Sequence, residues 1–142
     1  MDRKQLFKPI IYLALFMWVL DILVQKFYWY YSIWWFDIFV HFLGGFWVGM
    51  FFIWFFGVVR MPFVRRAIQD LNKQTLLYAL LFVLLVGISW EAGEFLTFNT
   101  IGREAFSMID TVSDILIDLA GGACALIYAI RKIVPKQVFK IQ

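Results

Sequence analysis

The sequence has few of the charged residues that cover the surface of a water-soluble domain. Only 16% of its 142 residues are charged, whereas 63% are hydrophobic and 21% are aromatic, and the mean hydropathy is +0.80. This composition excludes a water-soluble globular domain and indicates an integral membrane protein. From the length we expect one domain, residues 1–142.

Cysteine is nearly absent, which excludes an intramolecular disulfide. The single cysteine, Cys124, has no second cysteine to form a metal site with, and we interpret it as a small packing residue.

The net charge of +3 does not indicate a nucleic-acid partner, because the basic residues flank apolar runs and do not form one face. The first apolar run also lacks a small-residue cleavage site, so we expect it to remain as a helix.

Four long apolar segments predict an all-α bundle of four membrane-spanning helices in up-down-up-down order. The expected helices cover about residues 9–24, 37–59, 75–96 and 111–130, and Pro9 is expected in the first turn of the first one. Residues 60–73 combine basic residues with apolar residues at helical spacing, which predicts a short amphipathic helix on the membrane surface.

An aromatic segment separates the first two expected helices. Eight of the ten residues 27–36 are aromatic. Such a segment is typical of an interfacial belt, and the alternative is one wall of a site for a lipid head group.

The basic residues are distributed unevenly between the two ends of the predicted bundle. One side of the membrane would carry eleven of them: Arg3, Lys4, Lys8, Arg60, Arg65, Arg66, Lys73, Arg131, Lys132, Lys136 and Lys140. The other side would carry only Lys26 and Arg103. The positive-inside rule therefore predicts that both termini lie in the cytoplasm.

Acidic residues show the opposite distribution, since only Asp2 and Asp70 fall on the cytoplasmic side. The others gather with the only histidine at the outer ends of the helices: Asp21, Asp37, His41, Glu91, Glu94, Glu104, Asp110, Asp114 and Asp118. Three of these aspartates recur every four residues and form a stripe on one face of the last helix. An aspartate at the centre of a membrane helix costs roughly 2.5 to 3.5 kcal/mol, so the stripe implies partners.

Carboxylates grouped around one histidine suit a divalent cation, such as Mg²⁺, Mn²⁺, Ca²⁺ or Zn²⁺. The expected ligands are Asp37, His41, Glu91, Glu94, Asp114 and Asp118. A bound metal would polarise a phosphoryl or carbonyl oxygen or activate water, with Glu91, Asp114 and Asp118 as candidate catalytic carboxylates. The expected substrate is an envelope lipid or a lipid-linked intermediate, held by Trp90 and by Arg103, whose guanidinium would bind phosphate.

Several of these residues also have a simpler interpretation. Asp110 and Asp114 suit the capping of the last helix, with Ser107 as its expected N-cap. His41 suits a hydrogen-bonded packing position, Glu104 a solvated loop, and Asp21 a helix end. Glycines at 45 and 49 have the spacing that lets a neighbouring helix approach closely.

Two further functional classes remain open. One is a small ion or proton carrier that uses the aspartate stripe as a relay, and the other is a structural membrane subunit. A site that binds or acts on a lipid is favoured over the relay. The cytoplasmic halves of the helices lack the ionisable residues that a path for protons or ions across the membrane would need.

The motifs resemble those of two related groups of small bacterial membrane proteins. The pattern Asp37-x-x-x-His41, Glu91 and Asp114-x-x-x-Asp118-x-x-Gly121 resembles the VanZ-like family. Trp90-Glu91-x-x-Glu94 and Asp110-Thr111-x-x-Asp114 are similar to the YjdF-like group of inner-membrane proteins. The resemblance covers roughly residues 37–122 and departs at Ile38, where VanZ-like proteins often have lysine, and at Asp118, where they often have asparagine. It implies an envelope function, because VanZ-like proteins are associated with resistance to the glycopeptide teicoplanin.

Overall fold

The computed structural model describes residues 4–58, 73–101 and 107–138, and this part of the chain is helical without strands. Its helices are α1 (Lys4–Phe27), the single-turn α2 (Trp29–Ser32), α3 (Phe36–Val58), α5 (Lys73–Ile101) and α6 (Met108–Val138). The four long helices each contain a stretch that is long and apolar enough to cross a membrane. The prediction of an all-α bundle with four spanning helices is therefore confirmed.

The helices extend beyond the apolar runs that predicted them. We expected Pro9 in the first turn, but α1 begins at Lys4, so the proline lies inside the helix. At the other end of the chain α6 continues to Val138. An apolar run marks only the part of a helix that lies in hydrocarbon, whereas the backbone hydrogen bonds continue into the polar flanks. The expected amphipathic helix, residues 60–73, lies outside the described residues except for Lys73, where α5 begins.

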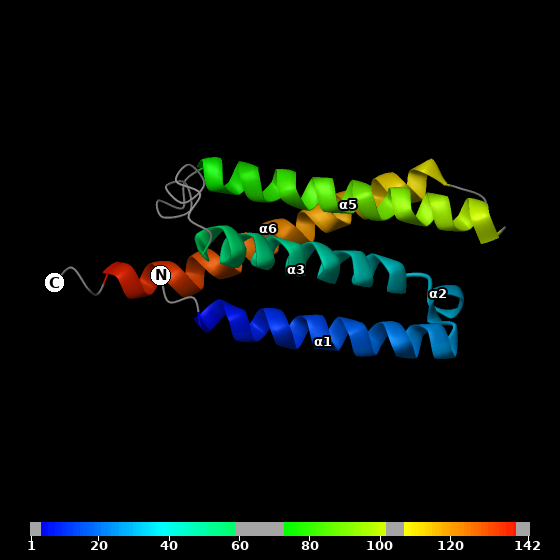
Figure 1. Ribbon diagram of the computed structural model, residues 1–142, viewed down its shortest axis with the longest axis horizontal. Helices are drawn as coiled ribbons and strands as arrows, with labels where there is room; N and C mark the ends of the chain where they lie inside the picture. Colours follow the sequence, from blue (N-terminus) through cyan, green and yellow to red (C-terminus); the bar gives the residue numbers. More distant parts are fainter. Residues whose placement is uncertain (1–3, 59–72, 102–106, 139–142) are drawn as a thin grey trace.

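The long helices alternate in direction, and α3 is the central one. It packs against α1, against α5 and most extensively against α6, which also packs against α5. Figure 1 shows α1 and α5 on either side of α3 in this view. The beginning of α1 and the end of α6 lie at the same end of the bundle (Figure 1).

Glycines set the close contact between α3 and α6. A Cβ atom on Gly45 would overlap the main chain of Asp118, and one on Gly121 would overlap the main chain of Phe42. One turn further along α3, a Cβ on Gly49 would lie 3.1 Å from the Cα of Gly122. The predicted close approach at the glycines of α3 is confirmed. It places the side chain of Asp118 beside α3.

A buried apolar cluster lies toward the end of the bundle where α1 begins and α3 ends. Its buried members are Leu6, Ile10, Met50, Phe52, Ile53, Ala79, Ala125, Leu126 and Ala129. Rings surround this cluster, and the indole Nε1 of Trp47 donates a hydrogen bond to the backbone oxygen of Ile10 at 3.0 Å. This bond connects α1 to α3. It also satisfies an indole N–H in a place where little water is available.

Candidate functional site

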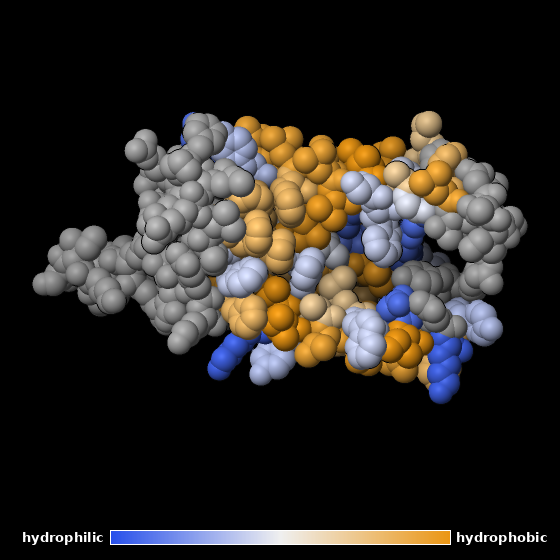
Figure 2. Space-filling model, in the orientation of Figure 1, coloured by the Kyte–Doolittle hydropathy of each residue, from blue (hydrophilic) through white to orange (hydrophobic). Residues whose placement is uncertain are grey.

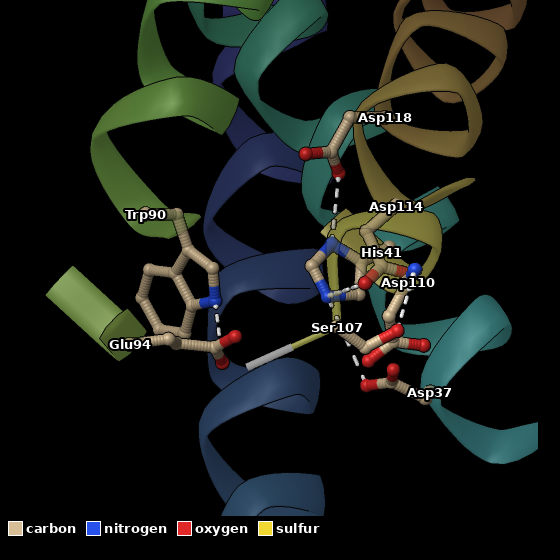
Figure 3. Close-up of polar contacts among 8 residues, drawn as sticks. All are labelled: Asp37, His41, Trp90, Glu94, Ser107, Asp110, Asp114 and Asp118. Carbon is tan, nitrogen blue, oxygen red and sulfur yellow. Dashed lines mark hydrogen bonds and ion pairs between the residues drawn. The ribbon is translucent and has the colours of Figure 1, made fainter. Parts of the chain in front are cut away.

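Three buried polar side chains stand out among the described residues: His41, Asp114 and Asp118, which are 7%, 4% and 8% exposed. They lie in the half of the bundle where α3 and α6 begin and α5 ends (Figures 1 and 3). Ionisable groups at this depth require partners, because an unpaired charge in a medium of low dielectric constant is costly.

The imidazole of His41 has carboxylates on both of its nitrogens (Figure 3). Nδ1 lies 3.5 Å from Oδ1 of Asp118. Nε2 lies 3.8 Å from Oδ1 of Asp37 and 3.9 Å from Oδ2 of Asp114. The ring therefore has one carboxylate neighbour on one nitrogen and two on the other.

The spacing of these residues explains why they meet. Asp37 and His41 are four residues apart on α3, and Asp114 and Asp118 are four residues apart on α6, so each pair lies on one face of its helix. The glycine contact described above brings the two helices together at the level of Asp118. Two short polar pairs thus face each other across the glycine contact between α3 and α6.

The first turn of α6 shows which residue caps the helix. The backbone N–H of Asp110 donates to Oγ of Ser107 at 3.3 Å, so the expected N-cap at Ser107 is confirmed. Asp110 itself is exposed. The capping interpretation of Asp114 is wrong, because this residue is buried against His41 inside the helix.

The arrangement of donors around Nε2 fits a metal ion. Asp37, His41 and Asp114 each offer one ligand atom, and these atoms lie within 4.8 Å of one another. Two oxygens and one nitrogen suit several divalent ions, and three protein ligands leave further coordination positions open.

Asp118 lies on the opposite side of the imidazole from this group. A carboxylate in this position can accept a hydrogen bond from Nδ1–H, which would leave the lone pair of Nε2 available to a metal ion between Asp37 and Asp114. Asp118 was expected to be a ligand, and this stays a prediction; it lies beside Nδ1 of His41 and is not one of the three grouped residues.

The two glutamates of α5 are placed differently from the aspartates. Oε1 of Glu94 accepts a hydrogen bond from Nε1 of Trp90 at 3.0 Å, and the indole is exposed. Oε1 of Glu91 is buried and has no hydrogen-bond partner among the described residues. Neither glutamate belongs to the group of three ligands. Most buried side-chain oxygens are hydrogen-bonded, so this atom of Glu91 is an exception among the described residues.

A cavity of about 370 Å³ adjoins the histidine. Its polar lining consists of Asp21, Asp37, His41, Glu94 and Asp118, and the indole of Trp90 also lines it. The rest is mainly apolar and comes from α1, α3 and α5. Figure 2 shows hydrophilic side chains at the bottom of a hollow between hydrophobic surfaces. Its volume falls within the range of about 300 to 1,000 Å³ that is typical of small-molecule sites.

Some of these features were not predicted from the sequence. Met17, Leu20 and Val24 of α1 form one wall of the cavity together with Asp21. Their spacing places them on one helical face, but the other residues of α1 between positions 9 and 24 are also apolar, so the sequence gives no sign of which face is the functional one. The alternative interpretation of the aromatic segment 27–36, as a wall of a head-group site, gains no support, since none of its described side chains lines the cavity. Arg103 and Glu104 lie outside the described residues.

The fold and the site together define a multi-pass membrane protein with a buried histidine and carboxylate cluster in one half of the helix bundle. The chain belongs to the family described as "Predicted membrane protein (DUF2238)", whose sequence pattern matches residues 1–133. No curated protein and no solved structure matches the chain. The family description supports the membrane assignment, whereas the resemblance to VanZ-like and YjdF-like proteins, the cytoplasmic termini and the catalytic roles remain predictions.

Proposed function

We propose that the protein holds a divalent cation between Asp37, Nε2 of His41 and Asp114, and that this site binds or acts on an envelope lipid. The observation that carries the proposal is the convergence of three ligand atoms within 4.8 Å, with the second nitrogen of the histidine next to Asp118. A histidine that only filled space would not need carboxylates on both sides of its ring.

Electrostatics supports a bound cation. Carboxylate oxygens within 4.8 Å of each other repel by roughly 3 kcal/mol at an effective dielectric constant of about 20. Asp114 is also buried, which strengthens the repulsion because water screens it less. A divalent ion between the carboxylates replaces this repulsion with attraction.

The donor set limits the choice of ion. One imidazole nitrogen with two carboxylate oxygens suits Zn²⁺ or Mn²⁺ better than Mg²⁺ or Ca²⁺, which prefer oxygen ligands alone. When bound, such an ion polarises a phosphoryl or carbonyl oxygen of a ligand in its open positions. The lipid part of the proposal is supported by the largely apolar cavity that adjoins His41 within the membrane-spanning segments.

A proton or ion relay across the membrane is less well supported. Among the described residues, the buried ionisable side chains are His41, Asp114 and Asp118, and all three lie in the same half of the bundle. A relay requires ionisable groups or water along the whole path.

Metal analysis of the purified protein tests the proposal. The protein should contain close to one equivalent of Zn²⁺ or Mn²⁺, and after removal of this ion it should bind the same ion again in calorimetric titration. His41→Ala should weaken binding at least 100-fold, because it removes the only nitrogen ligand. The exposed Asp110→Asn is the matched control and should bind like the parent. Equal binding by the His41→Ala variant, or no binding by the parent, would refute the site.

A further inference from the structure

The cavity beside His41 opens on the side of the bundle. Leu20 and Val24 line it from α1, and Val86 lines it from α5. Each of these helices packs along α3, but the packing between α1 and α5 is far less extensive. In Figure 2, viewed across the helix axes, the hollow with the hydrophilic side chains faces the reader between these two helices. The opening thus lies on the side of the bundle, between two helices that are long and apolar enough to span a membrane.

This position selects the kind of molecule that reaches the site. A lateral opening within the membrane-spanning segments faces hydrocarbon, so a ligand that enters there must be soluble in the bilayer. An acyl chain fits the apolar lining formed by Leu20, Val40 and Val86. The polar head group of the same molecule would then lie against His41 and the carboxylates.

The charges of the lining restrict the head group. A divalent ion held by Asp37, His41 and Asp114 is neutralised by its two carboxylates. The cavity lining also includes the carboxylates of Asp21, Glu94 and Asp118, and it contains no lysine or arginine among the described residues. A purely anionic head would find no basic side chain among the described residues of this lining, and a purely cationic head would leave the open positions of the metal without an oxygen ligand.

On the basis of the proposed metal site, we propose that the ligand is a zwitterionic phospholipid with a primary ammonium, of the phosphatidylethanolamine type. It enters between α1 and α5, places its phosphate at the ion and its ammonium among the remaining carboxylates, and keeps its chain in the apolar part of the cavity. Ammonium bound by carboxylates and phosphate bound by a divalent ion are the pairings that the chemistry of these groups favours.

Photolabelling in vesicles tests this inference. The metal-loaded protein is reconstituted in phosphatidylcholine containing a trace of a phosphatidylethanolamine with a diazirine in its acyl chain. After irradiation, the label should map to the lining of α1 and α5, and an excess of chelator should reduce it several-fold. Parallel samples contain the same diazirine chain on phosphatidylglycerol or on an alkyl trimethylammonium, and both should label more weakly.

Paired tryptophan variants test the lateral opening. Leu20→Trp and Val86→Trp fill the opening from opposite sides, so each should reduce labelling several-fold. Val19→Trp and Leu85→Trp are the controls, because these neighbouring exposed residues do not line the cavity. None of the four positions contributes a ligand to the ion, so all variants should keep the metal content of the parent. Because the two filling variants lie on separate helices at partly exposed positions, a folding defect in one leaves the other as a test.

The outcomes separate the two proposals. Absence of metal from the parent refutes the proposed function. If the parent contains metal but neither the chelator nor Leu20→Trp nor Val86→Trp changes its labelling, only the lipid inference is overturned. Stronger labelling by the anionic probe, or chelator-resistant labelling by the alkyl ammonium, overturns the zwitterionic head group.

Discussion

The two halves of the bundle use the same pair of helices for different purposes. In the half where α3 ends, α3 and α6 contribute buried apolar residues such as Met50, Ile53 and Leu126. In the half where both helices begin, the contact consists of glycines, with His41 and Asp118 beside them. Because lipid is as apolar as leucine, helices in a membrane gain little from burying apolar area and associate through close packing and polar contacts. The first half therefore holds the bundle by packing, whereas the second uses close backbone contact to place a polar site.

Gly121→Ala should have the largest effect on the site, because it should lower both the stability and the metal binding of the polar half, which depends on the backbone approach. The new methyl group would overlap the main chain of Phe42, which cannot rotate away as a side chain can. The helices would have to separate, at a cost at or above the roughly 1 to 3 kcal/mol that is usual for overpacking. We expect a large drop in the melting temperature and a loss of metal binding.

Gly93→Ala is the matched control for this experiment. It lies in α5 and an added Cβ would meet nothing within 4 Å. The variant should be as stable as the parent, or more stable by up to about 1 kcal/mol, because alanine favours helix. If Gly121→Ala melts and binds metal like the parent, the helix contact does not position the site.

Ile53→Ala tests the apolar half in the opposite way. Ile53 is fully buried, and deletion of such a side chain typically costs about 2 to 5 kcal/mol through the cavity that it leaves. The melting temperature should fall, while the metal affinity measured well below it should remain within about two-fold of the parent value, since the two halves are packed separately. A parallel loss of affinity would show that packing in the apolar half also controls the site.

The sequence was sufficient to predict the helices and one part of the site. Hydropathy marks a membrane span directly, because each span must be apolar over the thickness of the hydrocarbon. The pair Asp37 and His41 also followed from spacing alone, since residues four apart share a face on any helix.

Other parts of the site could not be predicted, because they depend on how each helix is rotated about its axis. Glu91 and Glu94 were grouped with the aspartates, yet α5 is apolar on most of its surface, so its pattern does not fix which side faces α6. The orientation of His41, with Asp118 on one nitrogen and Asp114 on the other, depends on contacts between helices that no single helix encodes. The single turn α2 could not be predicted either. It follows Tyr28, which has a positive φ of 55°, and nothing in this run of aromatic residues indicates that backbone conformation.

Asp118→Asn should have an intermediate effect and distinguishes a ligand from an orienting residue. If Asp118 acts only through Nδ1 of His41, the metal stoichiometry should stay unchanged while the affinity falls by about 10- to 100-fold. Asp114→Asn removes a proposed ligand and should weaken binding more. Titration of both variants with Zn²⁺ and Mn²⁺ gives the comparison, and a greater loss in Asp118→Asn than in Asp114→Asn would reverse the two roles.

The smallest effect is expected for Trp90→Phe at the edge of the polar half. This change removes the hydrogen bond from the indole to Glu94, and because the indole is 61% exposed, water can replace it as donor. Stability should therefore fall by no more than about 1 kcal/mol, and the metal affinity should not change, because neither residue is among the three ligands. Trp90 lines the cavity, so the photolabelling assay is the sensitive measurement. Weaker labelling at unchanged metal content would show that Trp90 and Glu94 contact the lipid. Reduced metal affinity would instead place the carboxylate of Glu94 nearer to the ion than its hydrogen bond to Trp90 indicates.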